Sequence, residues 1–117
     1  MRLNALSLLD QIVLVLLDEE PRHGFGVAAA IAADEALSMA ISVHRPLIYR
    51  SIDRLHAAGL VEPARTEPGE RGAPRTVWRT TAAGRDASLA WLGTTVPHPR
   101  DARLELLVTL ALATGAR

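Results

Sequence analysis

The segment from Val43 to Val61 constrains the fold of this chain more than any other part. Its sequence, VHRPLIYRSIDRLHAAGLV, predicts one amphipathic helix that stops at a glycine and runs into a strand. Apolar residues recur at i, i+4 and i+7 and mark one buried face: Ile48, Ile52 and Leu55. Charged and aromatic residues fall on the other side: Tyr49, Arg50, Asp53 and Arg54. A short helix with one apolar face and one arginine-bearing face is typical of helices that read DNA.

The residues around this helix supply its ends and a hairpin. Pro46 suits a first helical turn, and Gly59 suits a C-terminal stop. A short strand is expected at Leu60–Ala64, and residues 66–74 carry the prolines and glycines of a loop. Arg75–Thr80 alternates and reads as the returning strand, with Thr76, Trp78 and Thr80 on one face.

Two helices are expected before this segment. Leu3–Leu17 is apolar around most of its circumference, with polar residues in one narrow stripe: Asn4, Ser7, Asp10 and Gln11. Such a helix needs cover on two sides, and we expect one side to face the core and the other a partner chain. A second, alanine-rich helix begins near His23, which caps it or packs at its start, and runs to Ala32. Residues 34–42 read as a weakly patterned connection.

Two helices are expected after the hairpin. Thr81 is a suitable N-cap for a fourth helix from Ala82 to about Leu92. Asp101 caps a fifth helix that runs to Leu112 and is apolar on more than one face. The fold is therefore predicted to be mainly α, a winged helix-turn-helix of three helices and a two-stranded wing, followed by C-terminal helices for dimerisation. We expect a winged-helix domain over residues 1–81 and a linker and dimerisation segment over 82–117. A plain three-helix bundle would show the same helices without needing the arginine-bearing hairpin.

Composition narrows the setting. A chain of 117 residues is most simply one domain, and without cysteine it has no disulfide or thiolate metal site. No apolar stretch has the length of a membrane span, and no signal peptide is predicted, so we expect a cytoplasmic protein. Formal net charge is zero, but residues 1–40 hold two arginines against six acidic residues, whereas residues 41–85 hold eight against four. Positive charge thus gathers in the predicted reading helix and hairpin. All basic residues are arginine, for which genomic base composition is a sufficient reason.

Four segments in order resemble the PadR family of winged-helix transcriptional regulators. They are a leucine-rich helix followed by Pro21-Arg22-His23-Gly24-Phe25, then Ile48-Tyr49 with Gly59-Leu60-Val61, then Arg71–Arg75 through Thr81 and Gly84, and finally Pro97–Asp101 followed by Leu104–Leu107. The chain departs from the family at Pro46-Leu47, where a glycine and a serine or threonine are usual, and at Thr80, where leucine is usual. Larger members continue well beyond Ala113, so either the dimerisation segment is short or the sequence is a piece of a longer one.

The resemblance implies a homodimer, a repressor, that binds double-stranded DNA at a pseudo-palindromic operator. Six residues are the expected DNA contacts: Arg45, Tyr49, Arg50 and Arg54 on the helix and Arg71 and Arg75 on the wing. The alternative for the helix is a solvated face in which Asp53 pairs with Arg50 or Arg54.

Dimerisation or an effector pocket is expected at four apolar residues: Leu9, Val13, Trp91 and Leu107. Trp91 reads either as core or dimer packing or as the wall of a pocket. Relatives in the family respond to small hydrophobic or aromatic molecules, so the resemblance allows such an effector here.

Catalysis and metal binding are not expected. The four histidines are scattered without metal-ligand spacing, and no nucleophile, phosphate-binding loop or carboxylate pair stands out. No cofactor is predicted. The competing hypothesis is a winged-helix module that binds protein or a ligand without reading DNA, and the Pro46-Leu47 departure favours it.

Overall fold

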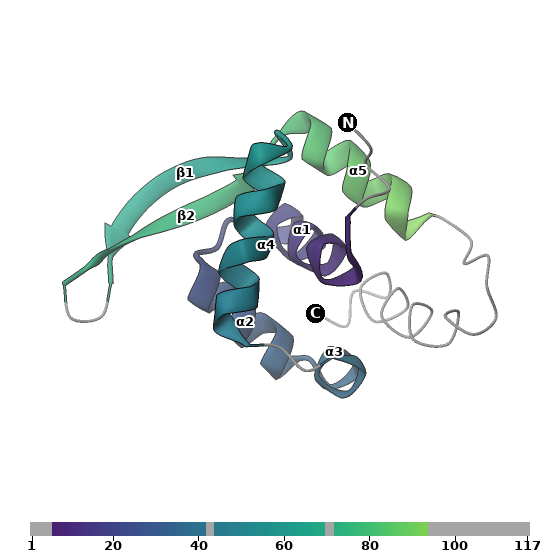
Figure 1. Cartoon of the computed structure of the whole chain (residues 1–117), viewed down its shortest axis with the longest axis horizontal. Coiled ribbons are helices and arrows are strands. Elements are labelled where there is room, and N and C mark those ends of the chain that lie inside the picture. Colours follow the sequence, from purple (N-terminus) through teal and green to yellow (C-terminus); the bar gives the residue numbers. More distant parts are fainter. Residues whose placement is uncertain (1–5, 42–43, 70–71, 94–117) are drawn as a thin grey trace.

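The computed structural model describes residues 6–41, 44–69 and 72–93. Its elements are α1 (Leu8–Glu19), α2 (Gly24–Ala33), α3 (Glu35–Ala40), α4 (Arg45–Ala57), β1 (Val61–Pro68), β2 (Pro74–Thr80) and α5 (Ala82–Leu92). Helix α4 crosses in front of α1, and the β1–β2 hairpin projects to one side as a wing (Figure 1). This is the predicted winged helix-turn-helix. The expected helix from Asp101 to Leu112 lies outside the described residues.

Helix α1 is the centre of the core. Six consecutive residues from Ile12 to Leu17 are each 4% exposed or less, and α2, α4, α5 and β2 all pack against the helix. The expectation that one side of α1 faces a partner chain is therefore wrong for this run. Val13 is fully buried inside the chain, so it is no dimer contact, and Leu9 packs against the same core.

Asp10, in the polar stripe of α1, is not solvated. Ser7 caps the helix: its Oγ accepts from the Asp10 amide, and the Asp10 carboxylate accepts in return from the Ser7 amide. Asp10 is only 2% exposed. The helix therefore begins at Leu8, with its first carboxylate turned inward toward α4.

One helix was not predicted. Residues 35–40, expected to be part of a connection, form α3, in which the Asp34 side chain accepts from the Leu37 amide at 3.0 Å. Leu37 is fully buried. A helix of six residues offers little periodicity to detect, which is why the pattern missed it. The predicted reading helix is consequently the fourth helix in chain order, not the third.

The end of α4 agrees with the prediction. Gly59 has a φ of 78°, its amide donates to His56, and the Leu60 amide donates to Leu55 at 2.9 Å. These two bonds form a Schellman motif, which satisfies the last carbonyls of the helix and directs the chain into β1. Gly59 supplies the left-handed backbone that this turn requires.

The wing strands are longer than predicted. β1 continues through residues expected to be loop and ends at Pro68, and a bulge between Pro63 and Arg65 accommodates the proline within the strand. The backbone of Arg22 adds a bridge to β2, exchanging hydrogen bonds with Trp78 at 3.0 and 2.8 Å. The base of the wing is thereby tied to the segment that joins α1 and α2.

Helix α5 packs closely on the turn that precedes β1. Thr81 caps the helix through the Gly84 amide, and its hydroxyl donates to the Gly59 carbonyl at 2.7 Å. The Cα of Gly84 lies so near the Leu60 carbonyl that a Cβ would collide with that oxygen. Among the described residues, every helix is too short or too polar to cross a membrane.

We expect Gly84→Ala to lower the free energy of unfolding by roughly 2 kcal/mol or more, because the backbone carbonyl of Leu60 cannot move aside for the added methyl group. Urea denaturation followed by circular dichroism measures this loss. Gly93→Ala is the matched control, since its nearest contact is 3.5 Å and its φ is negative. Equal stabilities for the two variants would contradict the close approach.

Candidate nucleic-acid interface

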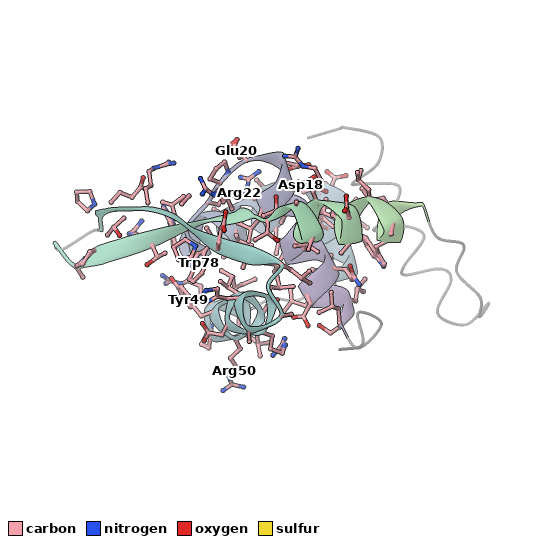
Figure 2. All side chains as sticks on the ribbon, turned by 90° about the horizontal axis from the view of Figure 1, so that it is seen from above. Asp18, Glu20, Arg22, Tyr49, Arg50 and Trp78 are labelled. Atoms are coloured by element: carbon pink, nitrogen blue, oxygen red, sulfur yellow. The ribbon has the colours of Figure 1, made fainter. Side chains whose placement is uncertain are left out.

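The exposed side of α4 presents a mixed surface, which we call the reading face: Leu47, Tyr49, Arg50 and Asp53. All four residues are exposed, whereas Ile48, Ile52 and Leu55 are buried on the opposite side. The amphipathic pattern therefore orients the helix as predicted. Arg50 reaches out from α4, away from the body of the protein (Figure 2). Within the described residues, Arg50 has no hydrogen-bonding or ion-pair partner.

Arg54 is held by a carboxylate from another helix. Its Nη2 and Nε donate to the two oxygens of Asp10 at 2.6 and 3.2 Å. Ser51 Oγ donates to the same carboxylate at 2.6 Å. We call these three residues the Asp10 cluster. Its acid is Asp10 of α1, and not Asp53, which the sequence offered as a partner for Arg50 or Arg54.

Two residues of the Asp10 cluster are buried, since Asp10 is 2% exposed and Ser51 is inaccessible, whereas the Arg54 side chain is 52% exposed. Burial acts to raise the pKa of Asp10, but the hydrogen bonds from Arg54 and Ser51 outweigh it and hold the pKa below its ordinary value of 3.8. The same contact raises the pKa of Arg54. The carboxylate therefore stays ionised at neutral pH, despite its burial.

Sequence reasoning missed Asp10 and Ser51, although a signal was present. Asp10 is a charged residue directly before the apolar run of α1, and Ser51 falls between Ile48 and Ile52 on the apolar side of α4. A polar residue at a core position of each of two neighbouring helices indicates a buried polar pair, because such groups need partners.

Tyr49 and Gly24 place α4 against the start of α2. The Tyr49 ring lies on the Cα of Gly24, where a Cβ would collide with it, and Tyr49 is still 48% exposed. His23 caps α2, as expected, with Nδ1 accepting from the Gly26 amide at 3.0 Å. The glycine of the His23-Gly24-Phe25 sequence thus provides room for the ring of the reading helix.

Phe25 joins the start of α4 to the wing. The guanidinium of Arg45 lies 5.1 Å from the centre of its ring, and that of Arg75 lies 5.4 Å away. Arg75 Nη1 is also 3.3 Å from Nε2 of His23. Two of the predicted DNA-contacting arginines are therefore brought to one aromatic residue. Arg71 and Leu107 lie outside the described residues.

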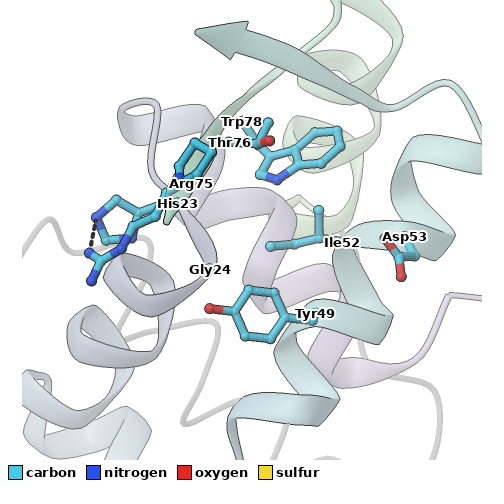
Figure 3. Close-up of a pocket in the computed structure, with 9 residues that line it drawn as sticks. His23, Gly24, Tyr49, Ile52, Asp53, Arg75, Thr76 and Trp78 are labelled. Atoms are coloured by element: carbon cyan, nitrogen blue, oxygen red, sulfur yellow. Dashed lines mark hydrogen bonds between the residues drawn. The ribbon is translucent and has the colours of Figure 1, made fainter. Parts of the chain in front are cut away.

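A pocket of about 270 Å³ opens between α4, β2 and the start of α2 (Figure 3). Tyr49, Ile52 and Trp78 give it apolar walls, and Asp53 and Arg75 contribute charge. Trp91 does not line this pocket; it is partly buried and packs against the core. No three carboxylate or imidazole groups of the described residues are gathered as metal ligands would be.

The fold and the arginine-bearing helix define a winged helix-turn-helix protein. The sequence model of the transcriptional regulator PadR-like family matches residues 13–89. The chain belongs to this family of transcriptional regulators. A search of curated protein sequences found no match.

Solved structures share the fold at low sequence identity. Bacillus subtilis PadR in complex with operator DNA matches with a TM-score of 0.68 and 22% identity, over 78% of this chain and 49% of that one. A transcriptional regulator of Thermoplasma acidophilum matches with a TM-score of 0.58 and 18% identity, over 94% of both chains. A PadR family regulator of Clostridium difficile R20291 matches at 0.57 and 15%, over 72% and 82%. The chain spans about half the length of the Bacillus protein.

Because the pKa of Asp10 is lower in the folded protein, its ion pair stabilises folding above the ordinary carboxyl pKa. That stability is lost as the pH falls below 3.8 and through the folded-state value. We expect Asp10→Asn to cost roughly 2 kcal/mol at pH 7 and to remove this part of the acid dependence. Urea denaturation between pH 3 and pH 7 measures both. A parallel loss of stability in wild type and variant over this range would contradict the assignment.

Proposed function

We propose that this chain binds double-stranded DNA sequence-specifically as a homodimeric repressor. In this proposal α4 enters the major groove with the reading face toward the bases, and the wing follows the adjacent backbone. The observation that carries the proposal is Arg50, an exposed guanidinium without a partner in the described residues, on a helix that is tightly anchored from behind. The operator complex of the related Bacillus protein supports it.

The proposed contacts divide by role. Arg50 and Tyr49 face the DNA, since both project from the exposed side of α4. Arg45 and Arg75 would contact phosphates beside the helix, because they flank Phe25 between the start of α4 and the wing. Arg71, at the predicted wing tip, would do the same. Arg54 was also expected to contact DNA, but its Nε and Nη2 already donate to Asp10, so it is not among the proposed contacts.

Dimerisation is proposed to use α5 and the residues that follow it, within residues 82–117. Leu89 on α5 is 59% exposed, so its side chain is accessible for such a contact. Leu107 and Trp91 belong to this proposed contact, in which the two reading helices would meet half-sites of a pseudo-palindrome. A small hydrophobic or aromatic effector that alters the spacing of the reading helices is part of the same proposal.

A second candidate is a winged-helix module that binds a protein or a ligand instead of DNA. The observation that favours it is Leu47, an apolar side chain that is 39% exposed in the first turn of α4. The family usually has a small hydroxyl residue there, suited to a phosphate. The neutral overall charge of the chain is in keeping with this candidate.

Selection of a preferred duplex from a random library tests the two candidates. We expect a preferred site, with affinity that falls log-linearly as salt is raised, because phosphate contacts release counterions. Arg50→Ala should weaken binding to that site by roughly 1–3 kcal/mol and leave binding to scrambled DNA nearly unchanged. Arg22→Ala is the control, since Arg22 pairs with Glu19 and lies on the side of the molecule opposite Arg50 (Figure 2). Failure to enrich any duplex would favour the interaction module.

The dimer is tested by sedimentation of the full chain at micromolar concentration. We expect a dimer, and we expect Leu89→Glu to raise the dimer dissociation constant at least about tenfold, because it would bury a charge in the contact. Arg79→Glu on the wing alters charge at an equally exposed position and should leave the dimer intact. A wild-type chain that sediments as a monomer would contradict the proposal.

A further inference from the structure

We infer that Asp10 is a positioning residue for the reading face: from α1 it holds Ser51 and Arg54, and so sets the rotation of α4 about its own axis. The inference rests on the proposed DNA binding. It adds to that function a residue of another helix, and it assigns Arg54 to anchoring rather than to reading bases.

Apolar packing alone sets the rotation of α4 loosely. Ile48, Ile52 and Leu55 are buried against α1, but apolar contacts have no preferred direction. The Asp10 carboxylate makes three hydrogen bonds to two residues of α4, at 2.6, 2.6 and 3.2 Å. Hydrogen bonds weaken steeply when their angles change, so these three resist a rotation that the apolar side would tolerate.

The anchored residues are direct neighbours of the reading face. Arg50 precedes Ser51 in sequence and lies one helical turn before Arg54. A rotation of about 15° would move a side-chain atom roughly 6 Å from the helix axis by ~1.5 Å. Recognition requires groups to be held to within about 0.5 Å, so the orientation of Arg50 depends on this anchoring.

Asp10 is itself fixed, which makes it a suitable anchor. It reciprocates the capping bond with Ser7 at the start of α1, and the helix continues into the fully buried run from Ile12. Burying a charged pair generally stabilises a fold less than an apolar pair of equal volume would. Directional contact, rather than added stability, is therefore the property that this pair contributes.

Arg54 has little of its guanidinium left for base recognition. Both Nε and Nη2 donate to Asp10, so one of the edges with which a guanidinium can hold a guanine in two bonds is already used. The side chain is still 52% exposed, which leaves its remaining donors near the surface. Loss of Arg54 should consequently act through the placement of α4.

The experiment compares full-length variants on the duplex selected for wild type and on a scrambled duplex of equal length. We expect Asp10→Asn and Arg54→Met each to lower the ratio of the two affinities about tenfold or more. The salt dependence should keep its wild-type slope, because neither change removes a phosphate contact. The double variant should be no worse than Asp10→Asn alone, since loss of the Asp10 carboxylate already breaks the ion pair with Arg54.

Asp18→Asn is the matched control. Asp18 lies on the same helix and also accepts hydrogen bonds, but from Thr80 and Arg85 at the base of the wing and on α5. A smaller loss of stability with an unchanged affinity ratio is expected for this variant, because the Asp18 pair with Arg85 is more exposed. An equal fall in the ratio for Asp18→Asn and Asp10→Asn would overturn the inference, as would a shallower salt slope for Arg54→Met alone.

Ser51→Ala keeps the inference testable if Asp10→Asn does not fold, because it removes one bond to the carboxylate and leaves the Arg54 pair in place. We expect its affinity ratio to fall about threefold or more, and an unchanged ratio would overturn the inference.

The outcomes also distinguish failure of the proposed DNA binding from failure of the proposed role of Asp10. If wild type prefers no duplex, the proposed DNA binding fails; if wild type has a preference that all three variants retain, only the role of Asp10 fails.

Discussion

The enclosure of α1 determines where the other elements lie. A helix with apolar residues on every side must be covered on every side, and in this chain α2, α4, α5 and β2 together provide that cover. The run from Ile12 to Leu17 is therefore satisfied within one chain. From the sequence alone, these residues suggested a contact with a partner chain. In the fold, such a contact would instead use residues that are exposed, among them Leu89 on α5.

Among the described residues, Asp10 makes a buried polar contact between α1 and the helix that carries the proposed function. Its hydrogen bonds to Ser51 and Arg54 orient α4 against α1. Gly24 contributes from α2 by letting the Tyr49 ring approach its backbone. Two neighbouring helices thus constrain α4 through directional or very close contacts, while the reading face stays open to solvent.

Features coded within a few residues were predictable from the sequence, and those that join distant segments were not. The Thr81 cap, the Gly59 stop and the amphipathic pattern of α4 are local, and the structure has all three. The bridge from Arg22 to Trp78 and the pair of Asp10 with Arg54 join residues far apart in sequence, and no local pattern records them. Helical spacing favoured Asp53 as the acid beside Arg54, but a buried carboxylate has a stronger need for a cation than an exposed one.

The ion pairs change what the charge distribution means for DNA binding. Arginines are concentrated in residues 41–85, yet several of them have a carboxylate partner within the described residues: Arg54, Arg65, Arg79 and Arg85. A paired arginine adds little to the long-range field, so a chain of zero net charge has only a weak general attraction for phosphate. Sequence-specific binding would then depend on a few well-placed groups, Arg50 foremost. The accuracy with which α4 is held therefore matters more here than it would in a strongly basic protein, where non-specific attraction supplies most of the affinity.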